Sequence, residues 1–428
     1  MTTLIIGGGW SGLAAAVTLT QQGHPVHLIE SAKQLGGRAR NVKWHNQTID
    51  NGQHLMIGAY HHMLEILQLI GIEQTSVFHR LALDLTIYDS QYPPLHLSSK
   101  GWLPWPLSLA WNFISSTGLS GLQQVVRLQL QIPDLLASND ITVSDWLLSS
   151  KQSERLIKQL WEPLCLATLN TPIHQASAHV MAKVLQESLG KGKKAADLLI
   201  PARPLGDVFP KAAAKYIKQH GGEISLQIRA KEILIRQGKV QGIMMGNNSI
   251  IAANNIIVAT SPSQCADLLA PHIKLTKPDE YPICTVFLQY PDNVRLPTPM
   301  LGMTGTLSQW IFDRSEQSPG LMAVVISAPG NHEKMSKQDL VQQVCKEIHQ
   351  NIPSLPTQAV HSFVIREKRA TFACTVNIEQ KRPHCQTDIQ GLWLTGDFIA
   401  NAFPATIEGA IHNGKICAHK LLNTDLCL

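Results

Sequence analysis

The start of the chain alternates short apolar runs with small-residue and polar segments, in the order strand, loop, helix, strand. Residues 4–6 (LII) predict a strand that is buried on both faces of a parallel sheet. Residues 13–22 (LAAAVTLTQQ) are good helix formers, and Gly23, with a proline shortly after it, predicts the end of that helix. Residues 26–29 (VHLI) predict a second strand, which leads to Glu30. This order predicts the opening β-α-β unit of a Rossmann-like α/β fold.

The loop between the first strand and the helix reads GGGWSG and fits the spacing GxGxxG. Its first glycine permits a tight turn, the second lets a pyrophosphate approach the backbone, and the third lets the helix pack close to the strand. Free N–H groups at the helix start attract phosphate, and an acid after the second strand can bind the adenosine ribose. A bare GxGxxG is also typical of an ordinary turn, but the flanking elements favour a dinucleotide site. The residues predicted to bind the cofactor here are Gly7, Gly9, Trp10, Ser11, Gly12, Glu30 and Ser31.

A second glycine pair, Gly36 and Gly37, precedes Arg38. Such a pair can bring backbone N–H groups and a guanidinium to the same pyrophosphate, because arginine suits bidentate phosphate contacts. The alternative is an ordinary glycine turn with a solvated arginine. GxGxxG followed by GGR resembles the FAD-binding flavoproteins of the amine oxidase and phytoene desaturase superfamily. The resemblance implies FAD rather than NAD, in a Rossmann-like domain of the glutathione-reductase and amine-oxidase type with an inserted α+β substrate domain.

A block in the middle of the chain carries the next mark that the resemblance implies. Residues 221–236 predict two strands, a hairpin at 237–239 leads to another, and residues 256–260 (IIVAT) predict a buried strand. In the superfamily this block returns to the cofactor domain. The residue that matches Ala230 then touches adenine through its backbone, and Ala259 closes the buried strand at the cofactor.

The end of the chain carries the last mark. Residues 392–394 predict a strand, Gly396 and Asp397 follow it, and a helix is then expected. Asp397 is placed to hydrogen-bond the ribityl chain or the pyrophosphate of FAD. The N–H groups of Thr406 and Ile407 at the helix start can face the flavin pyrimidine edge, where a helix dipole stabilises the negative charge of reduced flavin.

The segment DNGQH supplies the candidate polar groups beside the flavin. The superfamily has a D-x-G motif at this place, and the residues after it line the flavin and face the substrate. Gly52, Gln53 and His54 are therefore expected at the cofactor, and Gln53 and His54 are the candidate catalytic residues. A lone histidine is also commonly a satisfied core residue.

Two carboxylates near these motifs are given structural roles. Glu408 lies in the last helix beside Gly409, Ala410 and Gly414, and small residues at this spacing predict close packing. We therefore expect a structural carboxylate at Glu408 rather than a catalytic one. Asp50 is expected to cap the turn that follows it.

The remaining segments lack dinucleotide features and are predicted to form the substrate domain. This domain would comprise residues 76–204 and 263–384, and the FAD domain residues 1–75, 205–262 and 385–428. Residues 101–126 contain no charged side chain but three tryptophans, at 102, 105 and 111. Tryptophan favours membrane interfaces, and two prolines exclude a continuous spanning helix. The segment either dips into a bilayer at the mouth of the pocket or is buried in the substrate domain.

Residues 161–190 predict two helices that meet at Asn170, within the segment WEPLCLATLNTP. Together with NGQHxxxGAY and GDFxxxxFPATIEGA, this segment resembles the bacterial hydroxysqualene dehydroxylases, with matches from near residue 4 to near residue 420. The sequence departs from these relatives at residues 400–403, where they carry a Thr-Gly-type turn. A contact made by that turn is therefore not carried over.

The resemblance implies reductive removal of the hydroxyl of hydroxysqualene, which gives squalene for hopanoid biosynthesis. Loss of the hydroxyl leaves an allylic cation, and a hydride from reduced flavin quenches it. A general acid must protonate the departing group. His54 is the hypothesis for this acid, with water or Gln53-bound water as rivals. An electron donor that the sequence does not identify has to reduce the flavin.

Three other functions are compatible with parts of this pattern. A carotenoid-type desaturase or isomerase would share the fold, the cofactor and an apolar tunnel. An amine oxidase would need an aromatic cage beside the flavin, for which the last motif offers Trp393, Phe398 and Phe403. A non-enzymatic prenyl-binding chaperone of the same fold could dispense with the cofactor residues, which are all retained here.

Composition limits the classes of protein and of binding site to which the chain can belong. Hydrophobic residues make up 44% and charged residues 16% of the 428 residues, which excludes intrinsic disorder. A formal charge of +5 without a long basic run gives nucleic-acid binding no support. The eight cysteines lack the CxxC spacing of zinc and iron–sulfur sites, so no metal is expected and the thiols are expected in the core, in a reducing compartment.

The expected substrate determines the expected location. At about 0.8 kcal/mol per buried carbon, a chain of ~30 carbons carries roughly 20 kcal/mol or more of transfer free energy. Such a molecule has to come from a bilayer or a partner enzyme. The chain shows no signal peptide and no apolar run of about 18 residues. We therefore expect a cytoplasmic protein that lies on the surface of the inner membrane.

Overall fold

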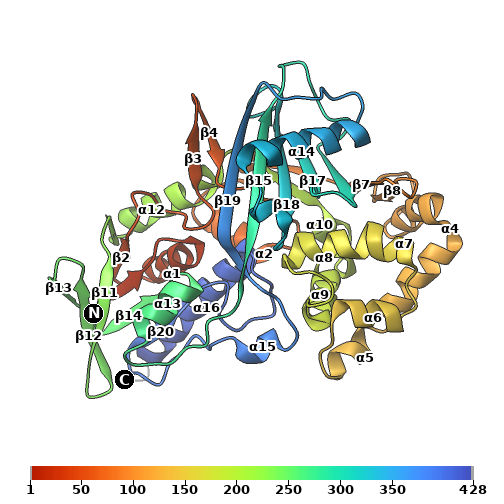
Figure 1. Cartoon of the computed structure of the whole chain (residues 1–428). Coiled ribbons are helices and arrows are strands. Elements are labelled where there is room, and N and C mark those ends of the chain that lie inside the picture. Colours follow the sequence, from red (N-terminus) through yellow and green to blue (C-terminus); the bar gives the residue numbers. More distant parts are fainter. Residues whose placement is uncertain (1, 426–428) are drawn as a thin grey trace.

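A five-stranded parallel sheet forms the centre of one half of the molecule (Figure 1). In this computed structural model residues 2–425 are described, and Met1 and residues 426–428 lie outside them. The strands in spatial order are β10 (Glu223–Leu226), β2 (Val26–Glu30), β1 (Thr3–Ile6), β14 (Asn255–Val258) and β20 (Leu392–Leu394). These strands confirm the apolar runs predicted at 4–6, 26–29, 256–260 and 392–394. The Rossmann-like α/β fold is therefore confirmed.

Helices cover this sheet and bring the two ends of the chain together. They are α1 (Trp10–Gln21), α11 (Leu205–Val208), α12 (Pro210–Gln219), α13 (Pro262–Leu269) and α16 (Ile407–Asp425). α1 begins three residues earlier than predicted, because the glycine loop itself opens the helix and Leu13 N donates to Gly9 O. α16 packs on α1 so closely that a Cβ on Gly414 would lie 2.3 Å from the Ser11 carbonyl oxygen. The predicted small-residue face of the last helix is thereby confirmed.

A seven-stranded mixed sheet forms the second half. Its order is β19 (His361–Phe372), β15 (Glu280–Gln289), β18 (Leu321–Ser327), β17 (Trp310–Asp313), β16 (Met300–Thr304), β7 (Asp84–Asp89) and β8 (Leu95–Ser98). All neighbours are antiparallel except β16 and β7. α14 (Lys337–Asn351) packs its apolar face against a separate core under this sheet. These strands lie within the predicted substrate domain, whose boundaries stay predictions.

Three smaller sheets join the halves or extend them. They are β11 (Ala230–Arg236), β12 (Lys239–Met245) and β13 (Ile250–Ala252); β3 (Asn41–Trp44) and β4 (Gln47–Asp50); and β5 (Met56–Ile57), β9 (Leu198–Pro201) and β6 (Phe78–Leu81). The first sheet contains the hairpin predicted at residues 237–239. The last sheet connects the segment after the DNGQH motif to the helical region.

A lobe made mainly of helices, among them α4 to α9, lies at one end of the molecule (Figure 1). The remaining helices are α2 (His61–Leu69), α3 (Gln74–Val77), α4 (Leu107–Leu130), α5 (Ile132–Ala137), α6 (Val143–Ser149), α7 (Glu154–Leu156), α8 (Glu162–Leu169), α9 (Ala178–Leu185), α10 (Lys193–Ala196) and α15 (Ile378–Lys381), with π turns η1 (Ile157–Trp161) and η2 (Gln186–Gly190) and the 3₁₀ turn η3 (Asn331–Glu333). α8 ends at Asn170 in the left-handed conformation (φ 49°), which confirms the predicted helix end.

The uncharged tryptophan-rich segment leads into α4 and lies on the surface. Trp102 is 90% exposed and Trp111 is 66% exposed, whereas Trp105 is partly buried against the core. The alternative that this segment is buried inside the substrate domain is therefore wrong for Trp102 and Trp111. Trp111 faces outward because α4 contacts the rest of the protein along its other face, through residues such as Phe113 and Leu128.

The cysteines, the possible metal ligands and the helix lengths agree with a fold built on side-chain packing. Seven cysteines are buried and free, as expected for core thiols, and Cys427 lies outside the described residues. Among residues 2–425 no group of three or more His, Cys, Asp and Glu side chains is arranged to hold a metal ion. Within the same residues no helix has the length and apolar character needed to cross a bilayer.

Candidate cofactor and substrate site

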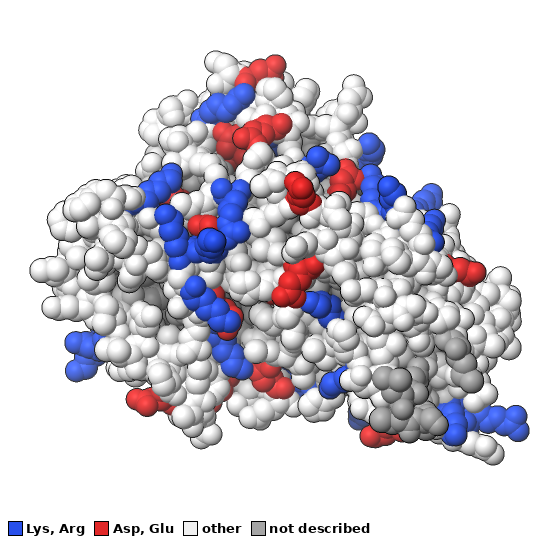
Figure 2. Space-filling model, turned by 180° about the vertical axis from the view of Figure 1, so that it is seen from behind, with Lys and Arg blue, Asp and Glu red and all other residues white. Residues whose placement is uncertain are grey.

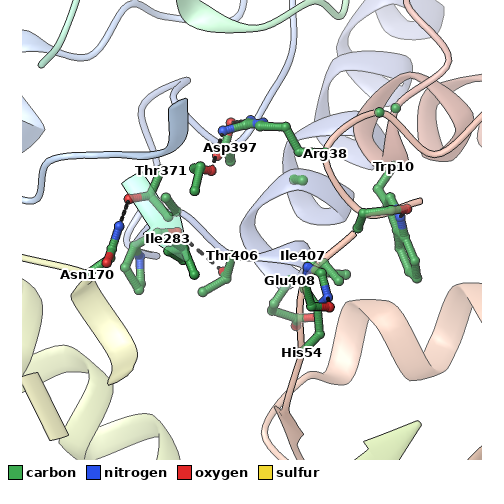
Figure 3. A pocket seen from close by; sticks show the side chains of 18 of the residues that line it. Trp10, Arg38, His54, Asn170, Ile283, Thr371, Asp397, Thr406, Ile407 and Glu408 are labelled. Carbon is green, nitrogen blue, oxygen red and sulfur yellow. Dashed lines mark hydrogen bonds and ion pairs between the residues drawn. The ribbon is translucent and has the colours of Figure 1, made fainter. Parts of the chain in front are cut away.

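One cavity of about 1100 Å³ joins the dinucleotide motifs to an apolar region (Figure 3). Residues from both ends of the chain line it. Those predicted from the sequence are Gly7, Gly9, Trp10, Ser11, Glu30, Ser31, Gly36, Gly37, Arg38, Gly52, Gln53, His54, Ala230, Ala259, Gly396, Asp397, Thr406 and Ile407. Gly12 is the exception, because it lies beneath the loop and does not border the cavity.

The three glycines of the GxGxxG loop have different physical reasons to lack a side chain. Gly7 has a φ of +113°, and a Cβ there would lie 2.6 Å from the Ala259 carbonyl oxygen. A Cβ on Gly12 would lie 2.1 Å from the Gly7 carbonyl oxygen, so Gly12 permits the close packing of helix and strand, as predicted. At Gly9 the nearest described atom to an added Cβ is the Cα of Gly37, at 4.0 Å. A side chain at Gly9 would stand in the cavity, so this is the glycine that leaves room for a ligand.

The start of α1 is open to such a ligand. Gly9 is its N-cap residue, and in the described structure no side chain caps this helix. The Ser11 hydroxyl and the Trp10 indole are engaged elsewhere, with Thr395 Oγ1 at 2.7 Å and Ala39 O at 3.1 Å. The backbone N–H groups of the first turn, with the positive end of the helix dipole, are thus left for an anion.

Glu30 both borders the cavity and holds the loop that surrounds it. Its Oε2 accepts from Gly8 N at 2.7 Å, and its Oε1 accepts from Ala32 N at 2.7 Å and Ser31 Oγ at 3.2 Å. A carboxylate fixed in this way is oriented before any ligand arrives. The structure therefore assigns Glu30 a role in shaping the loop in addition to the predicted ribose contact.

Arg38 and Asp397, which are far apart in sequence, form an ion pair at the cavity wall (Figure 3). Arg38 Nη2 donates to Asp397 Oδ1 at 2.5 Å, and Arg38 Nη1 donates to Ala370 O at 3.0 Å. Burial opposes the charge of Arg38, but the coulombic and hydrogen-bonding effects of Asp397 keep the pKa of Arg38 raised. Gly36 N donates to Gly8 O at 2.8 Å, which places the two glycine loops side by side.

The start of α16 reaches the cavity from the opposite side. Thr406 Oγ1 accepts from Gly409 N at 3.1 Å and so caps this helix. Glu408 points to α2, where its two carboxylate oxygens accept from His62 N at 2.8 Å and Met63 N at 2.9 Å. Glu408 thus makes a contact of the kind expected of a structural carboxylate, and it also borders the cavity. Burial raises the pKa of Glu408 to about 7, against the effect of the two N–H groups.

His54 and Gln53 border the cavity between these two regions. His54 Nδ1 lies 2.8 Å from Gly52 O, an arrangement in which Nδ1 carries the proton and donates it. The ring is partly buried at the cavity wall, and this burial, acting against the hydrogen bond to Gly52 O, lowers the pKa of His54 to about 4. The ring is therefore neutral near pH 7, with Nε2 left as a hydrogen-bond acceptor. Gln53 Nε2 donates to His54 O at 2.8 Å, which leaves its side-chain oxygen as a further acceptor.

The expectation that Asp50 caps its own turn is wrong. Asp50 Oδ1 accepts from Leu205 N at 2.6 Å, at the start of α11, and the side chain of Asn51 joins this segment to residues 38–40. Asn51 Oδ1 accepts from Arg40 N at 3.1 Å, and its Nδ2 donates to Arg38 O at 2.8 Å. The sequence could not show this difference, because the partner of Asp50 comes from a distant segment.

The far part of the cavity is mainly apolar. Its lining includes Leu83, Leu85, Leu97, Leu164, Met181, Leu198, Met300 and Phe312. Asn170 lies at its edge, where Nδ2 donates to Thr371 Oγ1 at 2.9 Å and Oδ1 accepts from Ala328 N at 2.6 Å (Figure 3). The asparagine of the LNTP segment thus joins α8 to the mixed sheet. We call this part the apolar arm.

The aromatic side chains that border the cavity come from four separate segments of the chain and are Trp10, Tyr60, Trp310, Phe312 and Phe403. Of the three aromatics near the last motif, Phe403 borders the cavity, whereas Trp393 and Phe398 are buried in the core. Sequence reasoning missed Tyr60, which also lines the cavity, and Arg382, which is buried behind the loop that carries Asp397. Tyr60 belongs to the GAY segment that follows DNGQH, and its closeness to that motif could have indicated that it lines the cavity. Arg382 had no motif to mark it.

These features fit a dinucleotide cofactor. One cavity is bordered by four features: the open start of α1, Gly9, which leaves room for a ligand, the fixed carboxylate of Glu30, and the start of α16. Such a set can bind phosphates and a ribose at one end and a flat ring system next to an apolar chain at the other. Hydride chemistry on a hydrophobic substrate is what this arrangement can support.

Comparison with known proteins agrees with this geometry. The family model described as flavin-containing amine oxidoreductase matches residues 10–422. A hydroxysqualene dehydroxylase of Zymomonas mobilis is 29% identical, over 98% of this chain and 99% of that protein. A 15-cis-phytoene desaturase of Glycine max is 21% identical, over 99% of this chain and 79% of that protein.

A solved structure extends the likeness to the fold. An oxidoreductase from Methanosarcina mazei superposes with a TM-score of 0.75 at 16% identity, over 99% of this chain and 100% of that one. At this identity the likeness concerns the fold alone. The family match, the cavity and the retained cofactor motifs agree with one another. The chain therefore belongs to the family of flavin-containing amine oxidoreductases: it is an FAD-dependent oxidoreductase, similar along nearly its whole length to hydroxysqualene dehydroxylases.

Proposed function

We propose that this enzyme removes the hydroxyl group of hydroxysqualene by reduction and produces squalene, as a step of hopanoid biosynthesis. In the balanced reaction, the alcohol and reduced FAD give the hydrocarbon, water and oxidised FAD. The observation that carries the proposal is the continuity of the cofactor cavity with the apolar arm, in a chain similar end to end to hydroxysqualene dehydroxylases.

The chain's own residues would hold the cofactor from three sides. The first turn of α1 after Gly9 and the loop at Gly37 would offer N–H groups to the pyrophosphate, while Gly36, whose N–H bonds to Gly8 O, holds the two loops together. Glu30 is available to the adenosine ribose, and the backbone of Ala230 to the adenine. Asp397 and the start of α16 at Thr406 and Ile407 face the flavin end. When bound, FAD supplies the hydride.

The apolar arm would bind the hydrocarbon chain and keep water away. A chain of ~30 carbons gains roughly 20 kcal/mol or more on leaving water, at about 0.8 kcal/mol per carbon. Bulk water would capture an allylic cation before hydride could, so a lining of leucine and methionine serves chemistry as well as affinity. Asn170 and Thr371 satisfy each other and do not present unpaired polar groups to the chain.

His54 and Gln53 would position the hydroxyl. With the pKa of His54 lowered to about 4, Nε2 accepts a hydrogen bond from the alcohol and does not act as the acid. This neutral state favours the alternative in which the proton comes from water, held by acceptors such as the Gln53 side-chain oxygen. A water bound by these two residues would relay a proton from solvent to the leaving hydroxyl, so that the hydroxyl departs as water and the relaying water is not consumed.

The substrate would arrive from a membrane surface through the α4 patch, defined here as Trp102, Leu107, Trp111, Leu119, Val126 and Leu130. All six side chains are large, apolar and exposed. The charged residues within 100–131 are Lys100 and Arg127, both cationic. The side of the molecule at the left of Figure 2 bears few charged side chains. An uncharged face with aromatic side chains and flanking cations suits an interface with anionic lipid.

Vesicle flotation tests the membrane contact. We expect the enzyme to float with vesicles that contain anionic phosphatidylglycerol, and the W102E/W111E variant to remain in the dense fraction. Ile250→Glu is the matched control, because Ile250 is 64% exposed in β13, at the opposite end of the molecule. Equal flotation of the W102E/W111E variant and the unaltered enzyme would contradict a docking role for this patch.

Product analysis tests the reaction. The reduced enzyme is incubated without oxygen with hydroxysqualene, and the oxidised enzyme separately with phytoene. The proposal predicts squalene from the first mixture and unchanged phytoene in the second. Desaturated products from phytoene would favour the second candidate, a carotenoid-type desaturase, which the similarity to phytoene desaturases keeps under consideration. Binding of prenyl chains without any turnover would instead identify a non-enzymatic carrier.

A further inference from the structure

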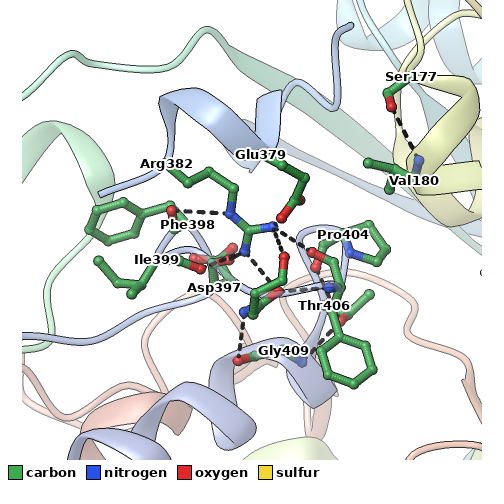
Figure 4. A network of polar contacts seen from close by, with 12 residues as sticks. Ser177, Val180, Glu379, Arg382, Asp397, Phe398, Ile399, Pro404, Thr406 and Gly409 are labelled. Atoms are coloured by element: carbon green, nitrogen blue, oxygen red, sulfur yellow. Dashed lines mark hydrogen bonds and ion pairs between the residues drawn. The ribbon is translucent and has the colours of Figure 1, made fainter. Parts of the chain in front are cut away.

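Arg382 is an arginine that the cofactor motifs do not include, yet its guanidinium lies directly behind the loop that leads to the flavin site (Figure 4). The side chain is 2% exposed and lies against the ring of Phe372, with Cζ 4.9 Å from the ring centroid. Glu379 Oε1 accepts from Nη1 at 2.7 Å. A charge buried this deeply needs partners, and the loop provides them.

The guanidinium donates to a set of oxygens that all belong to residues 397–403. The partners are Asp397 O at 2.6 Å, Phe398 O at 3.3 Å, Ile399 O at 2.7 Å, Asn401 O at 3.0 Å, Asn401 Oδ1 at 2.9 Å and Phe403 O at 2.8 Å. Five of the six are backbone carbonyls in a segment that is neither helix nor strand. The planar fork of arginine, with five N–H groups, is suited to such a ring of acceptors.

This loop connects β20 to α16 and carries Asp397 at its start and Thr406 just after its end. Asn413 of α16 holds it from the inner side, with Nδ2 donating to Gly396 O at 2.7 Å and to Ile399 O at 2.9 Å. Arg382 holds it from the outer side. The two contacts together fix the path of the backbone between the Asp397 carboxylate and the first turn of α16.

We infer that Arg382 is a positioning residue for the cofactor: it sets the loop conformation in which Asp397 and the start of α16 face FAD. The inference rests on the proposed placement of FAD at these residues and is independent of the substrate. Relatives were expected to carry a Thr-Gly-type turn at residues 400–403. Here the asparagine at 401 provides two of the acceptors, so the arginine takes part in holding a loop of different sequence.

Arg382→Lys is the main test, because it keeps the positive charge but has three donors on one atom and cannot reach a ring of carbonyls. We expect the dissociation constant of FAD from the purified holoenzyme to rise about tenfold or more. We also expect the potential of bound FAD to fall by about 30 mV, which is a tenfold loss of preference for the reduced form, because the start of α16 is displaced. Amide exchange within residues 396–406 of the holoenzyme should become faster.

Two further variants keep the inference testable. Asn401→Ala removes one acceptor from a partly exposed residue and should shift FAD affinity and potential in the same direction by a smaller factor; it decides the question if R382K does not fold. Arg314→Lys is the matched control, because Arg314 is also buried and bonded to a carbonyl, Pro201 O at 2.9 Å, but away from this loop. It should reduce stability without changing the flavin potential.

The inference is overturned if R382K retains the FAD affinity, the potential and the exchange rates of the unaltered enzyme. It is equally overturned if R314K weakens FAD binding as much, since the effect would then be general destabilisation. None of these three readouts involves substrate. Failure of the proposed reaction would leave these results unchanged, so the two claims are tested separately.

Discussion

Gly9 and Gly12 separate the binding role of the glycine loop from its packing role. The backbone of Gly9 is extended (φ −72°, ψ 177°), a conformation that alanine adopts without strain. An added Cβ would have the Gly37 Cα at 4.0 Å as its nearest described neighbour and would otherwise occupy the cavity. Gly9→Ala should therefore change the free energy of unfolding by less than about 1 kcal/mol, since the loss at an N-cap and the gain from a stiffer unfolded chain nearly cancel.

The same methyl group should obstruct the cofactor. It would stand where the pyrophosphate is proposed to approach the first turn of α1. We expect the FAD dissociation constant to rise about tenfold to a hundredfold, which corresponds to about 1.4–2.8 kcal/mol. Gly12→Ala should behave in the opposite way: its Cβ would lie 2.1 Å from Gly7 O, and relieving this contact should cost at least about 1–3 kcal/mol of stability.

The assay is urea unfolding of both variants after removal of FAD, with FAD titration of each followed by flavin fluorescence. Unfolding without cofactor is needed because bound FAD itself stabilises the folded state. Wild-type FAD affinity in G9A would refute the proposal that the pyrophosphate lies against Gly9. Wild-type stability in G12A would refute the packing argument.

Three other predictions concern single side chains. Glu30→Ala should weaken FAD retention while the chain stays folded, because both the ribose contact and the bond to Gly8 N are lost; unchanged FAD content would overturn this assignment. His54→Ala should slow turnover with FAD still bound, and turnover of the unaltered enzyme should show no histidine ionisation near its ordinary value, since the pKa of His54 is lowered to about 4; a full-rate variant removes His54 from the mechanism. The pKa of Glu408 is raised to about 7 in the folded protein, so its contribution to stability is complete below its unfolded pKa and is lost as pH rises to about 7, by roughly 3 kcal/mol. Urea unfolding at several pH values should show a smaller decline for Glu408→Gln, and an identical decline would place the titration elsewhere.

Local features of the structure could be predicted from the sequence, whereas long-range contacts could not. The β-α-β unit and the packing role of Gly12 follow from residues that are neighbours in sequence, and both were predicted correctly. The hydrogen bond of Asp50 to Leu205 N and the ring of carbonyls around Arg382 join segments that meet only after folding. No periodicity or motif indicates such partners.

The protonation state of His54 could not be predicted from the sequence either. A histidine in a motif is an obvious candidate acid, but its protonation depends on how closely the folded chain surrounds it. Burial favours the neutral ring and outweighs the opposite effect of the hydrogen bond to Gly52 O, which changes the proposed role from acid to hydrogen-bond acceptor. The exposure of Trp102 and Trp111 likewise became clear only once α4 was placed against the rest of the protein.

The central claim is that the flavin and a long hydrocarbon share one continuous cavity. Titrating the oxidised holoenzyme with squalene in detergent, while recording flavin absorbance, tests it most directly, with putrescine as a control ligand of different chemistry. The account predicts a saturable change in the flavin spectrum with squalene and none with putrescine. A spectrum that squalene leaves unchanged, or that responds to the amine instead, would contradict it.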